Sequence, residues 1–164
     1  MPYFEIVNED PELRKQLADF VIFFSTIENY ISDFAYRSEL FEGKRPNFRS
    51  IAKKDLSEKR EIIKSFINGK LPILMDLWNI INSRIGSLNN ERKFLIHSVG
   101  LFNINSSYFN TGVKQNGRFK IYSSSDIKKL NEQIDDLIFG DEGLASNFYS
   151  KFVDELESLK KAKT

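Results

Sequence analysis

The chain has no cysteine and a single histidine, His97, among its 164 residues. Without cysteine it cannot form a disulfide, bind a metal through thiolates or use a cysteine nucleophile. With one histidine, carboxylates are the main remaining metal ligands, and none of them belongs to a paired Glu-x-x-His arrangement. We therefore expect neither a metal nor a cofactor. The lack of cysteine is also typical of cytoplasmic proteins, and we expect a cytoplasmic location.

A surplus of charge of one sign is also missing. The chain has 24 basic and 23 acidic residues, for a net charge of +1. A protein attracted to a polyanion by its overall charge would be clearly basic, so we expect any RNA contact to be local. The sequence "GKRPNFRSIAKK" at 43–54 is the best candidate for wider RNA contact, although a solvated loop is the more common meaning of such a cluster.

Long apolar runs and familiar site motifs are absent as well. No run approaches the roughly 18 apolar residues of a membrane span, and the acidic, proline-containing first 15 residues do not predict a signal peptide. There is no glycine-rich phosphate loop, no HExxH and no EF-hand loop. The serine in "GLASNF" (143–148) lacks the flanking glycines of a nucleophile elbow.

Apolar residues recur at three- and four-residue spacing along most of the chain. They predict a mostly helical single domain over residues 1–164. Capping residues, prolines and glycines place the predicted helices at about 11–41, 55–68, 72–86, 87–100, 125–139 and 144–159. Asp55 and Glu58 are predicted to form a capping box at the start of the second helix, and Ser125 is predicted to cap the fifth. Residues 43–54 are predicted to be a loop.

Residues 103–125 lack a helical period. Asn116–Gly117 lies between two β-prone runs, which is a strong signal for a hairpin. We therefore predict an all-α fold, an antiparallel helical bundle with a small β-hairpin inserted around residues 108–123.

The sequence "RKFLIH" places Arg92 five residues before His97, near the end of a predicted helix. The chain resembles the HEPN superfamily of small helical domains, whose signature is an arginine, four to six residues and a histidine late in the bundle. The long first helix containing "FSTIENYISDF" (24–34), the glycine just after the motif and the capped closing helix also fit. The pattern covers roughly residues 10–160, but only the Arg–His pair is specific. Many active members have a small polar residue after the arginine, whereas this chain has Lys93.

This resemblance implies a metal-independent endoribonuclease of a toxin–antitoxin or phage-defence system, with RNA and an antitoxin or another protein as partners. His97 would act as the base on the RNA 2′-OH, since imidazole titrates near neutral pH, and Arg92 would stabilise the phosphate charge. Glu28 would either orient Arg92 or be exposed to solvent without a role. The remaining candidates for supporting or substrate-binding roles are Asn90, Glu91 and Lys93.

Five residues along a helix correspond to about 140° of rotation and roughly 7.5 Å of rise, so the two side chains do not share one face. A two-fold homodimer could bring arginine and histidine together across a cleft, and active family members generally work this way.

A second reading stays open. Arg92 would then be an ordinary solvent-exposed arginine, and His97 would cap the end of its helix. The protein would be a catalytically inactive helical module for dimerisation or protein interaction. Trp78 and Tyr30 could stack on bases, but both belong to apolar stripes that favour core packing.

Overall fold

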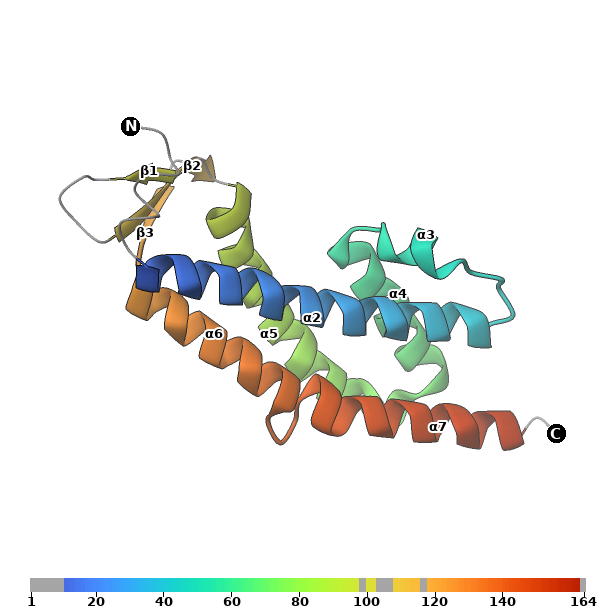
Figure 1. Ribbon diagram of the computed structural model, residues 1–164. Helices are drawn as coiled ribbons and strands as arrows, with labels where there is room; N and C mark the ends of the chain where they lie inside the picture. Colours follow the sequence, from blue (N-terminus) through green and yellow to red (C-terminus); the bar gives the residue numbers. More distant parts are fainter. Residues whose placement is uncertain (1–10, 98–99, 103–107, 116–117, 163–164) are drawn as a thin grey trace. The chain divides into compact units, whose positions relative to one another are not determined.

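The computed structural model describes residues 11–97, 100–102, 108–115 and 118–162, with side chains over 11–95 and 122–162 (Figure 1). The described chain is mostly helical, which confirms the predicted helical class. Its helices and strands are, in order, α2 (Pro11–Phe41), α3 (Phe48–Ala52), α4 (Leu56–Lys70), a 3-10 turn (Pro72–Leu74), α5 (Met75–His97), β1 (Gly100–Phe102), β2 (Tyr108–Gln115), β3 (Arg118–Ser123), α6 (Ser124–Phe139), a π-helical turn (Leu144–Phe148) and α7 (Tyr149–Lys161).

The chain divides into two compact units. The first consists of the described residues within 1–24 and 85–135, and the second of those within 25–84 and 136–164. Helices α2, α5 and α6 each contribute residues to both units.

The first unit contains the only sheet of the described chain, with the antiparallel strand order β1-β2-β3. Phe102 pairs with Phe109, and Tyr108 pairs with Ser123. Strands β2 and β3 lie inside the range 108–123 where the sequence predicts a hairpin. The turn at 116–117 lies outside the described residues, so the hairpin stays a prediction. Strand β1 was not predicted, because three residues are too few for a strand pattern.

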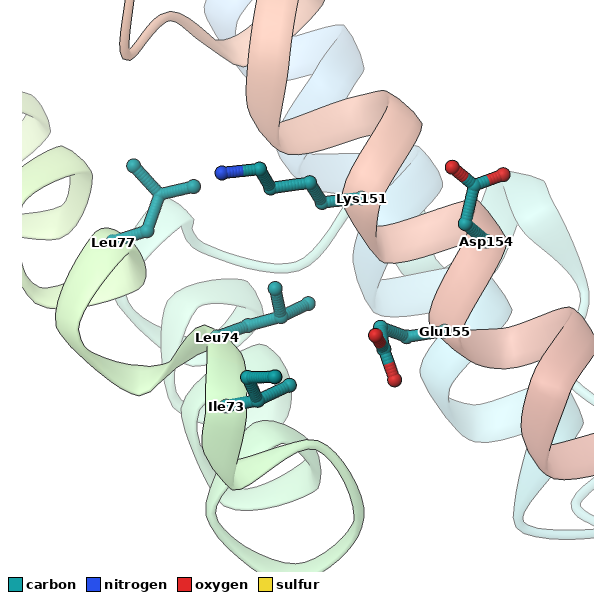
Figure 2. Close-up of a pocket in the computed structure, with 6 residues that line it drawn as sticks. All are labelled: Ile73, Leu74, Leu77, Lys151, Asp154 and Glu155. Atoms are coloured by element: carbon teal, nitrogen blue, oxygen red, sulfur yellow. The ribbon is translucent and has the colours of Figure 1, made fainter.

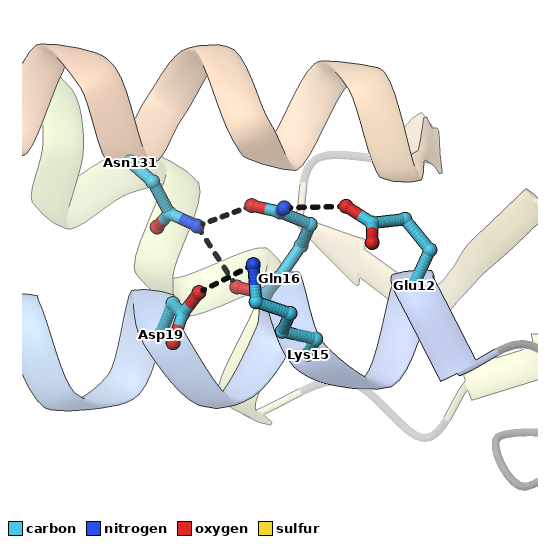
Figure 3. Close-up of polar contacts among 5 residues, drawn as sticks. All are labelled: Glu12, Lys15, Gln16, Asp19 and Asn131. Carbon is cyan, nitrogen blue, oxygen red and sulfur yellow. Dashed lines mark hydrogen bonds and ion pairs between the residues drawn. The ribbon is translucent and has the colours of Figure 1, made fainter.

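Helices α2 and α6 run side by side in the first unit (Figures 1 and 3). The Asn131 side-chain amide of α6 donates to both the backbone oxygen and Oε1 of Gln16, each at 3.0 Å. Gln16 in turn donates to Glu12 at 2.6 Å, while Lys15 pairs with Asp19 at 3.9 Å on a more exposed part of α2. The buried amides fix how these two helices align, because a buried polar group without a partner is costly.

Aromatic rings dominate the core of the second unit. Phe34 meets Phe148 edge to face, with ring centroids 4.9 Å apart, and meets Phe152 at 5.2 Å. Trp78 is fully buried and lies 5.6 Å from Phe148. Trp78 therefore packs in the core and is not accessible for stacking on a base. Tyr30 is half-buried and packs against Phe34 and Tyr149.

The predicted break at Gly86 is wrong, since α5 runs without interruption from Met75 to His97. A glycine inside a helix costs only about 1 kcal/mol relative to alanine. On either side of it, Ile85 and Leu88 are buried, and burying each such side chain contributes about 1.5–3 kcal/mol. Packing therefore outweighs the glycine.

The predicted loop at 43–54 contains the short helix α3, which is a second correction. Asn47 caps this helix by accepting a hydrogen bond from the Arg49 N–H at 2.9 Å. Ile51 is 2% exposed and anchors the helix. A helix of five residues is too short to show a helical period, so the sequence could not predict α3.

Capping residues account for the other helix starts. The backbone N–H of Asp55 donates to Glu58 at 3.1 Å, which confirms the predicted capping box of α4. Helix α6 is capped by Ser123 rather than by the predicted Ser125. The Asp126 N–H donates to the Ser123 hydroxyl oxygen at 3.1 Å, and the Ser123 N–H donates to Asp126 at 2.9 Å.

Candidate functional site

Helix α5 carries both members of the Arg–His pair. Arg92 lies five residues before the end of this helix, and His97 is its last residue. The side chain of His97 lies outside the described residues, so its predicted role as a base stays a prediction. The site can therefore be built only from Arg92 and its neighbours.

Arg92 is half-buried, and its guanidinium carbon lies 5.1 Å from the centroid of the Phe24 ring. Phe24 belongs to α2 and is only 1% exposed, so the ring is held firmly. A cation over an aromatic face gains about 0.5–1 kcal/mol at exposed sites and more where water is excluded. The contact therefore holds the Arg92 guanidinium beside the Phe24 ring.

Glu91, the residue before Arg92, is tied to Tyr122 of β3. The Tyr122 hydroxyl donates to Glu91 Oε2 at 2.5 Å, and Tyr122 is 5% exposed. Burial raises the pKa of Tyr122, and the hydrogen bond to the Glu91 carboxylate raises it further. Tyr122 therefore remains protonated around neutral pH and acts as a fixed donor. This contact holds the Arg92 segment of α5 against the end of the sheet.

Tyr122 was missed by the sequence reasoning. It lies 31 residues from Glu91, and no local spacing marks a contact between a helix and a strand at that separation.

Asn90 and Lys93 are both exposed. Either side chain could therefore meet a ligand approaching the end of α5, but no described geometry assigns them that role. Asn89, one residue earlier, is half-buried, and its Oδ1 is a buried acceptor with no hydrogen-bond partner in the described part of the chain. The sequence reasoning did not single out Asn89.

Glu28 belongs to the second unit, whereas Arg92 belongs to the first. The expected orientation of Arg92 by Glu28 therefore stays a prediction. Within its own unit, the charge of Glu28 affects the pKa of the buried Lys59. Burial lowers the pKa of Lys59, and the charges of Glu28 and Asp55 partly oppose this. The Lys59 ammonium donates to Ser32 Oγ at 3.0 Å and to the Ala52 carbonyl at 2.8 Å.

A pocket of about 270 Å³ lies elsewhere, in the second unit (Figure 2). Three apolar residues around the start of α5 and three charged residues of α7 line it, with Lys151 extending toward Leu77. Its lining residues are Ile73, Leu74, Leu77, Lys151, Asp154 and Glu155. None of the predicted site residues is among them, so this pocket is not part of the candidate site.

No known protein family, curated protein or solved structure matches this chain. Within the described ranges, no three histidine, aspartate or glutamate side chains are grouped to hold a metal ion. None of the helices described is both long and apolar enough to cross a membrane. Function therefore has to be inferred from the Arg92 segment of α5 and from the surfaces of the two units.

Proposed function

We propose that the protein is a HEPN-like, metal-independent endoribonuclease that acts as a cytoplasmic homodimer, in the role of a toxin or phage-defence effector. The observation that carries this proposal is the position of Arg92 and His97 at the end of one continuous helix. The position of the Arg92 guanidinium over the firmly held ring of Phe24 supports it, because a guanidinium with restricted motion binds phosphate at a lower entropic cost.

In the proposed reaction, His97 removes the proton of an RNA 2′-OH, and the 2′ oxygen attacks the adjacent phosphorus. The bond from phosphorus to the 5′ oxygen breaks, and His97 of the partner subunit donates a proton to that oxygen. The products are a 2′,3′-cyclic phosphate and a 5′-OH, and no water or metal is consumed. Arg92 stabilises the added negative charge on the phosphate in the transition state.

The proposal includes the remaining features of the predicted architecture. The helices would form a single antiparallel bundle domain over residues 1–164, with the hairpin as an insertion. The ends of two α5 helices would face one another across the two-fold axis, since about 140° separates Arg92 from His97 around one helix. Glu28, Asn90, Glu91 and Lys93 would support the site or contact the RNA, and an antitoxin or another protein would regulate it.

Expression in a bacterial host tests this proposal without knowledge of the substrate. Wild-type protein is expected to arrest growth, and His97→Ala and Arg92→Ala are expected to abolish the arrest, at matched protein levels on a blot. Lys151→Ala, in the unrelated pocket, is the matched control and should remain toxic. Cellular RNA should then contain new cuts ending in a 2′,3′-cyclic phosphate, and purified protein should make them in excess EDTA.

Arrest by His97→Ala equal to that by the wild type would refute the assigned role of His97. Loss of cutting in EDTA would refute the metal-independent mechanism.

A second function is favoured by the same contact that orients Arg92. A guanidinium over a buried ring also serves as a structural contact between α5 and α2. The Glu91–Tyr122 hydrogen bond likewise stabilises the fold without any chemistry. On this reading the protein is a catalytically inactive module for dimerisation or protein interaction. Arg92→Ala would then lower the thermal stability, and neither the wild type nor any variant would cut RNA.

A further inference from the structure

The segment 43–54 carries five basic residues and no acidic residue. Lys44 is neutralised within the second unit, because it pairs with Glu42 at 3.0 Å and with Glu39 at 3.7 Å. Arg45, Arg49 and Lys53 are exposed, and none of them forms an ion pair with a residue that the structure describes. A local excess of positive charge is therefore concentrated around α3.

The geometry of α3 decides where these charges point. Ile51 is the buried residue of this helix and faces the interior. At about 100° per residue, Arg49 and Lys53 each lie roughly 160° around the helix from Ile51. Both side chains therefore point directly away from the interior. They are also four residues apart, which makes them like-charged neighbours that repel one another.

Phe48 lies beside these charges and is 47% exposed. It is about 60° around the helix from Ile51, at the flank of the buried face. Tyr36 of α2 meets it edge to face, with ring centroids 5.7 Å apart and an angle of 77° between the rings. The ring is thus held in place by one neighbour while nearly half of its surface meets solvent.

The α3 helix is itself fixed to the second unit. Besides the burial of Ile51, the Lys59 ammonium donates to the carbonyl of Ala52, the last residue of α3, at 2.8 Å. Asn47 caps the other end. The cations and the aromatic ring are therefore presented on an anchored support.

We propose that Arg45, Phe48, Arg49 and Lys53, here called the α3 surface, bind single-stranded RNA. Cations that contact the phosphates, combined with an aromatic ring that stacks on an unpaired base, are the usual means of binding single strands. A duplex offers no splayed base to the ring. Five residues also make α3 too short to lie along a membrane as an amphipathic helix. The polyanion would relieve the repulsion between Arg49 and Lys53.

This inference extends the proposed function by naming a contact surface for RNA, but it does not depend on cleavage. The test therefore uses the full chain with His97→Ala as the background, so that the RNA stays intact. A fluorescein-labelled, unstructured RNA of about 12 nucleotides is within the range that single-strand sites cover. Its fluorescence anisotropy would be measured at several salt concentrations, and circular dichroism would confirm that each variant is folded.

Arg49→Gln with Lys53→Gln should weaken binding about tenfold or more at low salt. The double change should also reduce the slope of log affinity against log salt by about 1.4, since each phosphate contact contributes roughly 0.7 for single strands. Phe48→Leu should weaken binding about fivefold or more at an unchanged slope. Lys128→Gln with Lys129→Gln removes the same charge from the exposed side of α6 and should leave binding unchanged.

Absence of RNA binding would refute the proposal that the α3 surface binds RNA. An equal loss of RNA affinity in the two double variants would refute it as well. Equal or tighter binding of duplex RNA or of phosphatidylserine vesicles would overturn the choice of single-stranded RNA, as would full binding by Phe48→Leu. Binding that requires Arg49 and Lys53, without cutting by the wild type, would refute the proposed nuclease and leave this inference intact.

Discussion

Glu91 and Arg92 are adjacent in sequence but make different kinds of contact in the candidate site. Arg92 rests on the face of Phe24, while Glu91 accepts a hydrogen bond from the buried Tyr122. The hydrogen bond fixes the backbone from which Arg92 extends, so that Tyr122 acts on the site through Glu91. Neither contact could be read from the sequence, because each joins residues far apart in the chain.

Tyr122→Phe should destabilise the protein by about 1–2 kcal/mol in urea unfolding at neutral pH. The change removes a hydrogen bond to a carboxylate that is left half-buried. Tyr30→Phe is the control, since it removes a hydroxyl from a half-buried tyrosine of the second unit. An equal effect of both substitutions would contradict the importance of the Tyr122 hydroxyl.

The stabilising contribution of the Tyr122 hydroxyl should also depend on pH. Because folding raises the pKa of Tyr122, its hydroxyl stays protonated in the folded state after it begins to ionise in the unfolded state. Its stabilising contribution is therefore complete below the ordinary tyrosine pKa of about 10 and is lost as the pH rises above that value. The stability gap between wild type and Tyr122→Phe should narrow above pH 10. A gap that stays constant there would contradict the direction of the pKa shift.

At the scale of elements, the turn between α6 and α7 has a closely packed backbone at Gly143. A Cβ at Gly143 would lie 2.6 Å from the Ile138 carbonyl oxygen and 2.8 Å from that of Gly140. Both obstacles are backbone atoms, so the turn itself would have to move. The Gly143 carbonyl also accepts hydrogen bonds from the N–H groups of Asn147 and Phe148. These bonds form the π-helical turn that leads into α7.

Gly143→Ala is therefore expected to destabilise the protein by about 1–3 kcal/mol. Gly69→Ala in α4 is the opposite case, because a Cβ there meets nothing within 4 Å. That substitution should stabilise the protein by about 0.5–1 kcal/mol. The melting temperatures of both variants can be measured by thermal unfolding. A lower melting temperature for Gly69→Ala than for Gly143→Ala would refute the packing described for this turn.

The elements also show which features a sequence encodes locally. The bounds of α2 and the start of α4 follow from an apolar period and a capping box, and both were predicted. The continuity of α5 across Gly86 and the existence of α3 depend on burial by distant residues, so neither could be predicted. The spacing of Arg92 and His97 is encoded locally too, but it does not reveal what surrounds them.

At the scale of the whole molecule, the proposed nuclease requires a second copy of the chain. Light scattering at micromolar concentration should therefore give twice the mass of one chain. The Arg49→Gln, Lys53→Gln double variant should give the same mass, because the α3 surface is proposed for RNA and not for dimerisation. A monomer in both cases would count against a site shared by two subunits.

The complete burial of Trp78 in the second unit has a practical consequence for spectroscopy. Trp78 is the only tryptophan of the chain, so tryptophan fluorescence reports the unfolding of that unit alone. Far-ultraviolet circular dichroism reports the helices of both units. Coincident melting curves from the two signals would mean that the units unfold as one cooperative system, and separated curves would mean that they unfold in succession. The native sequence thus contains an optical label for one half of its structure.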